Sequence, residues 1–130
     1  LVEVHLPAET LSLFVHAALS ERAIFNVLEN AAKFSPEHKA VSVHVAKMNE
    51  KEIEIAISDQ GQGIPEDERD RIFDMFYTME RGDRGQYGTG LGLTIVKAII
   101  GAHMGEIVAS SAQNNQGTCI RMQLPIQQVA

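Results

Sequence analysis

The chain has 130 residues, of which 45% are hydrophobic and 22% charged, a composition typical of one soluble globular domain. Its net charge of -6 argues against a nucleic-acid partner bound through a broad basic surface. The single cysteine, Cys119, excludes an internal disulfide and a cysteine-based metal site. The sequence contains neither a signal peptide nor an apolar run of about 18 residues. We therefore expect a soluble cytoplasmic domain, and the start at Leu1 rather than at methionine suggests a fragment of a longer protein.

Short strands and one long helix are predicted in the first third of the chain. Residues 2–6 and 11–15 have the pattern of short strands separated by a turn. Residues 17–34 carry apolar side chains at helical spacing, which gives this helix one apolar stripe. The stripe consists of Ile24, Val27, Leu28 and Ala31. Pro36 ends the helix, because proline cannot continue it and restricts the preceding Ser35.

An antiparallel hairpin is predicted next. Residues 41–45 and 53–57 place valine or isoleucine at every second position, and a polar turn at 49–51 lies between them. Two runs with a period of two and a short connection are typical of a hairpin. One face of the hairpin is apolar, so we expect helices to cover it.

The second half of the chain continues the mixture of helices and strands. Pro65 is followed by three acidic residues, which suits a helix start. Residues 78–89 are polar and contain glycine, which predicts a loop, and a second long helix is expected from about residue 91 to 104, stopped by Gly105. The closing strands are predicted at 106–111 and 118–124. This uneven alternation favours an α+β two-layer sandwich with helices on one face of a mixed sheet.

A first group of candidate residues lies on the helix at 17–34. Asn26, Asn30 and Lys33 follow one another at intervals of four and three, so they share one face. An amide oxygen is a hard neutral ligand that suits Mg2+, and a lysine can meet phosphate as a point charge. A solvated helix face would give the same pattern, and this helix alone does not decide between the two.

A second and a third group are rich in glycine. Asp59 stands at the end of a predicted strand and is followed by Gly61 and Gly63, which suits a loop whose backbone approaches a flat ligand, although a simple turn would look the same. Residues 88–94 read Gly-Thr-Gly-Leu-Gly-Leu-Thr and lead into the second long helix. The exposed N–H groups of such a helix start can hold an anion. The run is not a P-loop, because no Lys-Ser/Thr pair follows and no strand precedes it.

Together, in this order and spacing, the three groups resemble the N, G1 and G2 boxes of the Bergerat-fold (GHKL) ATPases, the group that contains gyrase, Hsp90, histidine kinases and MutL. Residues 72–76, Ile-Phe-Asp-Met-Phe, resemble the F box of histidine kinases. The likeness runs from Leu1 to Pro125. Phe-Tyr followed by Gly82-Asp83 and the Gly-Thr-Gly run most resembles the potassium-responsive KdpD-type sensor kinases. By this resemblance, residues 1–130 form the catalytic, ATP-binding (HATPase_c) domain of a bacterial sensor histidine kinase.

The resemblance implies a fold and a set of roles. The fold is a mixed five-stranded sheet covered by three helices, with ATP between two helices and a lid loop. Asn30 would coordinate Mg2+, Asn26 would assist it, Lys33 would lie near the phosphates, and Asp59 would accept a hydrogen bond from the adenine amino group. The other nucleotide-binding positions implied are Gly61, Gly63, Ile64, Phe73, Phe76, Gly88, Thr89, Gly90, Leu91, Gly92, Leu93 and Thr118.

The same resemblance implies that residues 78–89 form the lid, made flexible by Gly82 and Gly85. Arg81 and Arg84 are candidates to swing onto the phosphates, although solvated loop charges are an equal reading.

The reaction class is read from Asn26. Hydrolysing relatives and anti-sigma-factor serine kinases carry a glutamate general base four residues before the metal-binding asparagine, whereas an amide cannot take a proton. Glu29 lies about 300° round the helix from Asn26, so it need not face the same atom. This favours phosphoryl transfer to a histidine over hydrolysis.

The acceptor histidine is expected outside the chain. No histidine here is followed by an acidic residue, so His5, His16, His38, His44 and His103 are read as structural or solvated. The partners implied are the dimerisation helices that carry the acceptor histidine and the receiver domain of a response regulator. The parent would be anchored in the inner membrane, and the isolated domain would be monomeric. A serine kinase of the anti-sigma type and a nucleotide-sensing module that never transfers phosphate remain as alternatives.

Overall fold

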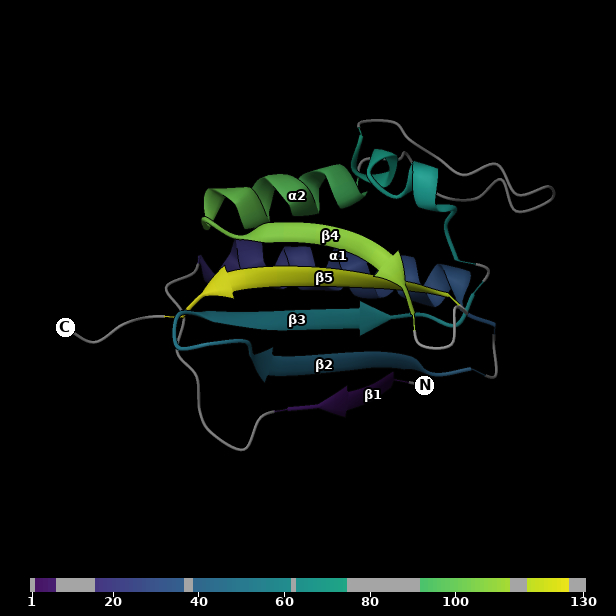
Figure 1. Ribbon diagram of the computed structural model, residues 1–130, viewed down its shortest axis with the longest axis horizontal. Helices are drawn as coiled ribbons and strands as arrows, with labels where there is room; N and C mark the ends of the chain where they lie inside the picture. The colour runs from purple at the N-terminus through teal and green to yellow at the C-terminus, as the bar shows by residue number, and fades with distance from the viewer. Residues whose placement is uncertain are drawn as a thin grey trace.

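The computed structural model describes residues 2–6, 16–36, 39–61, 63–74, 92–112 and 117–126. One layer is a five-stranded sheet in the order β1-β2-β3-β5-β4 (Figure 1). The strands are β1 (Val2–His5), β2 (Val41–Lys47), β3 (Glu52–Ser58), β4 (Glu106–Ser111) and β5 (Thr118–Pro125). β1 pairs with β2 in parallel and every other pair is antiparallel, so the sheet is mixed. The predicted α+β sandwich with a mixed five-stranded sheet is confirmed.

The second layer consists of helices on one face of the sheet. α1 (Ala17–Phe34) and α2 (Gly92–Ala102) pack against each other, and each also contacts strands of the sheet. In Figure 1, α1 runs behind β5, and α2 follows the edge formed by β4. The short 3-10 helices η1 (Glu66–Glu68) and η2 (Arg71–Phe73) complete this layer, and η2 contacts α2.

The helix expected after Pro65 is thus two single turns of 3-10 helix in the described residues. Residues 66–71 are all charged, so an α-helix there would have no apolar face to bury. Only Ile72 and Phe73 of η2 are buried. The acidic residues follow Pro65 at the start of η1, as predicted. The helix stays short because none of the residues of η1 is buried against the core.

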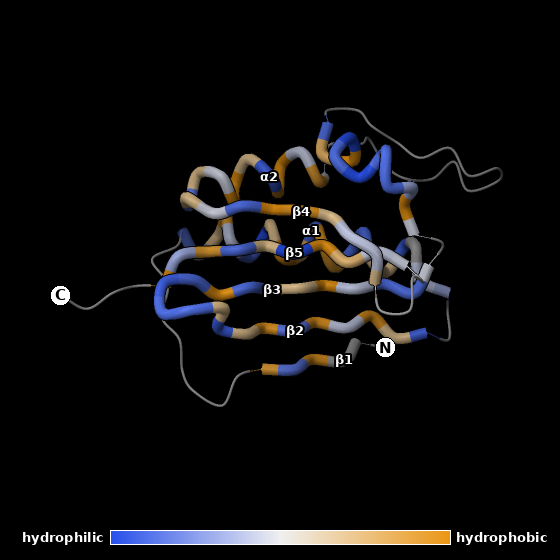
Figure 2. Tube along the Cα trace, in the orientation of Figure 1, coloured by the Kyte–Doolittle hydropathy of each residue, from blue (hydrophilic) through white to orange (hydrophobic). Residues whose placement is uncertain are grey.

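The core lies between the sheet and the helices. Antiparallel pairing sets Ile53 opposite Leu124, Ile55 opposite Met122 and Ile57 opposite Ile120, and all six side chains are buried. The alternation along these strands is visible as changes in hydropathy in Figure 2. Burying one such side chain stabilises a fold by about 1.5–3 kcal/mol, so these three pairs also determine the register, because a slip by one residue would turn them to solvent.

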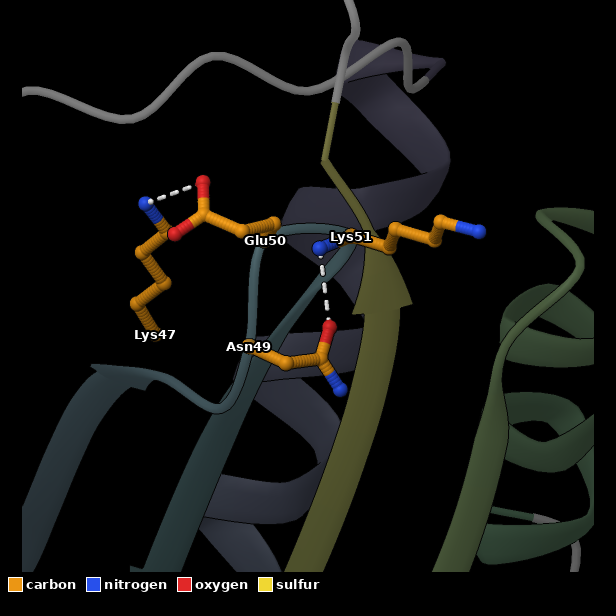
Figure 3. A network of polar contacts seen from close by, with 4 residues as sticks. All are labelled: Lys47, Asn49, Glu50 and Lys51. Carbon is orange, nitrogen blue, oxygen red and sulfur yellow. Dashed lines mark hydrogen bonds and ion pairs between the residues drawn. The ribbon is translucent and has the colours of Figure 1, made fainter.

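The turn of the β2–β3 hairpin is closed by its own side chains (Figure 3). Asn49 Oδ1 accepts a hydrogen bond from the backbone N–H of Lys51 at 2.8 Å. Lys47 Nζ lies 3.3 Å from a carboxylate oxygen of Glu50, whose side chain is 90% exposed, so this ion pair adds little. The predicted polar turn is confirmed, and the asparagine side chain explains why it is tight.

The end of α2 differs from the expectation in one residue. Met104, not Gly105, has the left-handed backbone, with φ at 62°. Gly105 donates its N–H to the carbonyl of Ile100 at 2.9 Å, and a Cβ at this position would collide with the carbonyl oxygen of Gln123. Glycine is therefore required at 105 by the close approach of β5, and the αL cap that glycine usually provides is taken by an exposed methionine.

Some sequence predictions fall outside the described residues. They are the strand at 11–15, the loop at 78–89 and most of the third glycine-rich group. Among the described helices, none has the length and apolar character to cross a bilayer.

Candidate functional site

Two buried polar residues lie side by side where β3 ends and β5 begins. Asp59 is 4% exposed and Thr118 is 6% exposed, and they are the buried polar side chains in the part of the chain that the structure describes. Asp59 Oδ1 accepts hydrogen bonds from the N–H of Gly61 at 2.9 Å and of Thr118 at 3.1 Å. The Asp59 N–H donates to the Thr118 carbonyl at 2.9 Å. The carboxylate is therefore held rigidly through one of its two oxygens.

The second oxygen of Asp59 has a different environment. No N–H or O–H from the described ranges donates to Oδ2. Burial raises the pKa of Asp59 above its ordinary value of 3.8, and the hydrogen bonds from Gly61 and Thr118 oppose the rise. A buried carboxylate oxygen that no described residue satisfies needs a donor from a ligand or from water, because burial without a hydrogen bond is costly.

Two glycines allow the backbone to pass closely around Asp59. Gly117 has φ at 84°, and a Cβ there would collide with the carbonyl oxygen of Asp59. Gly63 has φ at 83°, and its Cβ would lie 3.1 Å from the carbonyl oxygen of Gly117. Gly63 is one of the ligand-facing glycines predicted from the sequence, whereas Gly117 is not among them, although a glycine directly before a buried strand is a sign of a close approach.

The amides of the first group lie on the flank of α1's buried stripe. Asn26 and Asn30 are half-buried one turn apart, and Lys33 is exposed. The fully buried stripe beside them is formed by Ala23, Val27 and Ala31. Within the described ranges, no side-chain hydrogen bond is made by Asn26 or Asn30, so both amides are available to a ligand.

Hydrogen bonds connect the end of α1 to the loop after Asp59. The N–H of Gln60 donates to Ser35 Oγ at 3.0 Å, and Gln60 Nε2 donates to the carbonyl of Ala40 at 2.8 Å. The C-terminal end of α1, two residues beyond Lys33, is therefore held against the loop of the second group. Neither Ser35 nor Gln60 was predicted to take part, because the partners are 25 and 20 residues apart and no local pattern reports such a contact.

A further bridge fastens the segment that follows Gly63. Arg69 Nε donates to the carbonyl of Ile64 at 3.2 Å, and Arg69 Nη2 donates to Ser111 Oγ at 2.7 Å. Ser111 pairs with Thr118 across β4 and β5. Arg69 therefore ties Ile64, a predicted nucleotide-binding residue, to the edge of the sheet beside Thr118. Sequence reasoning missed this arginine, which stood in a run of charges.

The predicted F box is joined to the start of α2. Phe73 is 6% exposed and belongs to the core, and its carbonyl accepts a hydrogen bond from Thr94 Oγ1 at 2.8 Å. Gly92 is the first residue of α2 and is exposed, and Leu93 is half-buried. Phe76, Gly88, Thr89, Gly90 and Leu91 lie outside the described residues, so of the third group the structure describes only the end, residues 92–94.

The arrangement suits a flat heterocycle with a donor on its edge, next to amide side chains and a helix start. Among the described residues, no three His, Cys, Asp or Glu side chains gather as a metal site. A metal here would therefore be held by neutral amide oxygens and by oxygens of the ligand itself, which is the environment that Mg2+ accepts.

Comparisons with known proteins show the family to which the chain belongs. The family described as histidine kinase-, DNA gyrase B- and HSP90-like ATPases matches residues 16–128. The adaptive-response sensory kinase SasA of Gloeothece citriformis is 35% identical over 125 residues, which cover 96% of this chain and 31% of that kinase. The sensor protein KdpD of Clostridium acetobutylicum is 34% identical over 95% of this chain and 14% of its own length. The chain thus spans less than a third of either relative. The solved structure of a mycobacterial sensor histidine kinase, MprB, superposes with a TM-score of 0.82 at 32% identity, over 98% of this chain and 84% of that one.

Proposed function

Since the chain belongs to the family of histidine kinase-, DNA gyrase B- and HSP90-like ATPases, we propose that it is the Mg-ATP-binding catalytic domain of a sensor histidine kinase. In this role it donates the γ-phosphate of ATP to a histidine on dimerisation helices elsewhere in the parent protein, for relay to an aspartate of a response regulator. The observation that carries the proposal is the buried Asp59 carboxylate, which is anchored through Oδ1 and lacks a donor from the described residues on Oδ2.

The adenine amino group is the donor that we assign to Asp59 Oδ2. Guanine carries a carbonyl oxygen where adenine has this amino group. A carboxylate that faced guanine would lose a hydrogen bond and meet a repelling oxygen, at a cost of about 1–3 kcal/mol or more. Thr118 is buried against Asp59 and supports the same edge of the base, and Gly61 and Gly63 line the approach. The domain should therefore prefer ATP to GTP.

The residues of α1 fit a magnesium ion. Asn30 offers a half-buried amide oxygen that no described side chain occupies, Asn26 offers a second amide one turn earlier, and Lys33 reaches solvent beside them. When bound, Mg2+ neutralises charge on the phosphates and orients them. In this reading Asn30 holds the ion, Asn26 assists, and Lys33 meets phosphate oxygen as a cation.

The start of α2 is the phosphate-binding end in this proposal. Gly92 opens the helix without a side chain, so N–H groups of the first turn are exposed to an anion, and the helix dipole favours negative charge there. The contacts assigned to Gly88, Thr89, Gly90 and Leu91, to Phe76, and to Arg81 and Arg84 stay predictions.

The proposed reaction is transfer to histidine rather than hydrolysis. A histidine ring nitrogen from the parent attacks the γ-phosphorus, the bond to the bridging oxygen breaks, and ADP leaves with that oxygen. Asn26 cannot serve as a base for water, and the nucleophilic nitrogen of histidine needs none at neutral pH. Because ATP is cytoplasmic, we place this domain on the cytoplasmic side of a parent that is anchored in the inner membrane.

Calorimetry and phosphate labelling test the proposal together. Mg-ATP should bind the domain more tightly than Mg-GTP, and Asp59→Ala or Asn30→Ala should weaken ATP binding. The isolated domain should label nothing, whereas addition of the parent's histidine-bearing helices should produce an acid-labile phosphate. Equal affinity for ATP and GTP would remove Asp59 from its role, and an acid-stable phosphate on serine would replace the histidine kinase with a serine kinase.

A further inference from the structure

Phe73 is held by α2 at two points. Thr94 Oγ1 lies 2.8 Å from the Phe73 carbonyl oxygen, and Lys97 Nζ lies 5.9 Å from the centroid of the Phe73 ring. Thr94 and Lys97 are three residues apart, so both project from one face of α2. Both contacts join α2 to η2, and the hydrogen bond spans 21 residues of sequence.

The hydrogen bond from Thr94 is directed away from its own helix. Thr94 is the third residue of α2, so the helix has no carbonyl three or four residues earlier that could accept a bond from its hydroxyl. The hydroxyl donates to the last residue of η2. η2 is only three residues long, and a single 3-10 turn has little stability of its own. What fixes Phe73 is the core around its ring together with the Thr94 hydroxyl.

We propose that Thr94 is a positioning residue that fastens the first turn of α2 to the buried Phe73 and so sets this turn for the phosphates of the nucleotide. The inference rests on the proposed ATP binding. The ring of Phe73 belongs to the core cluster, so its carbonyl is a fixed reference point, and the Thr94 hydroxyl transfers that position to the turn that begins at Gly92. Lys97 adds a weak second contact one turn further along.

A positioning role for Thr94 predicts different effects on the two ends of the nucleotide, the phosphates and the base. Asp59 and Thr118 are held by β3, β5 and their own backbone, and no contact of Thr94 that the structure describes reaches them. Loss of the Thr94 hydroxyl should therefore weaken binding of the triphosphate and leave recognition of the base unchanged. A merely structural threonine would change both together or neither.

The test uses Thr94→Val, which keeps the shape and removes the donor, and Thr94→Ser, which keeps the donor. Affinities for Mg-ATP and for adenosine are measured by calorimetry on wild type and both variants. We expect Thr94→Val to weaken Mg-ATP binding by about threefold to tenfold, the size of one lost hydrogen bond, with adenosine unchanged and Thr94→Ser close to wild type. Thr94→Ala serves as the second donor-free variant if Thr94→Val does not fold.

Each outcome decides the inference. If the donor-free variant binds Mg-ATP as wild type does, or loses adenosine to the same extent, Thr94 does not position the phosphate end. If Thr94→Ser behaves like Thr94→Val, the hydroxyl is not responsible. If wild type itself ignores Mg-ATP, the proposed function fails along with the inference, and this result is distinct because it does not depend on the variants.

Discussion

The substitution Asp59→Asn should separate stability from nucleotide binding. Asparagine keeps an acceptor oxygen for the N–H groups of Gly61 and Thr118, and it removes the charge that burial opposes. Burial raises the pKa of Asp59, so the folded state binds its proton more tightly than the unfolded state does. The free energy of unfolding of the wild type therefore falls as pH rises from the ordinary pKa of 3.8 to the higher pKa of the folded state. The asparagine variant does not titrate, so it does not lose this stability.

Affinity for the nucleotide should change in the opposite direction from stability, because Asp59→Asn weakens ATP binding. The hydrogen bond from the adenine amino group to a charged acceptor is worth about 1.5–3 kcal/mol, which corresponds to roughly a 10- to 150-fold loss of affinity. Once the asparagine oxygen is occupied by Gly61 and Thr118, its NH2 group faces the amino group of adenine, and two donors oppose each other.

Urea unfolding and calorimetry measure the two effects. At about pH 7 the ligand-free Asp59→Asn variant should be as stable as wild type or more stable, and this advantage should shrink as the pH is lowered toward the pKa of Asp59. Its affinity for Mg-ATP should fall by the factor above. A variant that is less stable than wild type at neutral pH, or that binds ATP unchanged, would refute the reasoning about this carboxylate.

Three further substitutions test separate features. Met104→Gly should raise the free energy of unfolding by about 0.5–1 kcal/mol in urea denaturation, because Met104 has a left-handed backbone, is 85% exposed and loses no burial; a decrease would show that its side chain stabilises the cap. Gly117→Ala should destabilise the domain by more than about 2 kcal/mol and weaken ATP binding, since its Cβ would meet the backbone of Asp59, and an unchanged melting temperature would contradict that contact. Asn30→Ala should leave thermal stability near that of wild type while weakening Mg-ATP binding by about tenfold or more in magnesium buffer, and an equal loss in EDTA would mean that the amide does not act through the metal.

Much of the fold was predictable because its signals are local. The apolar stripe of α1 and the Ser35-Pro36 stop predicted its bounds, and the alternation of valine and isoleucine predicted the β2–β3 hairpin. The polar turn at 49–51 was read correctly for the same reason. In these segments the local pattern and the tertiary packing favour the same structure.

Features that depend on contacts between distant residues were not predictable. The position of β5 between β3 and β4 follows from pairing across more than 60 residues, which period alone does not specify. The helix predicted after Pro65 is a different case, because the run of charged residues at 66–71 that leaves an α-helix no apolar face is already visible in the sequence. Glycine usually takes the left-handed conformation at a helix end, but here Met104 has it. Gly105 is required for another reason, because a Cβ at 105 would collide with the carbonyl oxygen of Gln123, and this contact cannot be read from the sequence.

In the candidate site, too, the residues of local motifs were predictable and the residues that act through distant contacts were not. Asp59, Gly63 and Thr118 were named from their motif, and the structure brings them together at one end of the sheet. The residues that hold the motifs in place, Arg69 and Gln60 among them, act through hydrogen bonds that span 5 to 42 residues of sequence. Their side chains are ordinary surface types, so nothing in the sequence marked them.

The most direct measurement is the change in backbone amide chemical shifts as Mg-ATP is added to the labelled domain. If one adenine nucleotide with its metal lies against α1, the loop after β3 and the start of α2, amides near Asn30, Gly61 and Gly92 should all shift with one common midpoint. Shifts confined to a single one of these segments, or none at saturating nucleotide, would contradict a shared site.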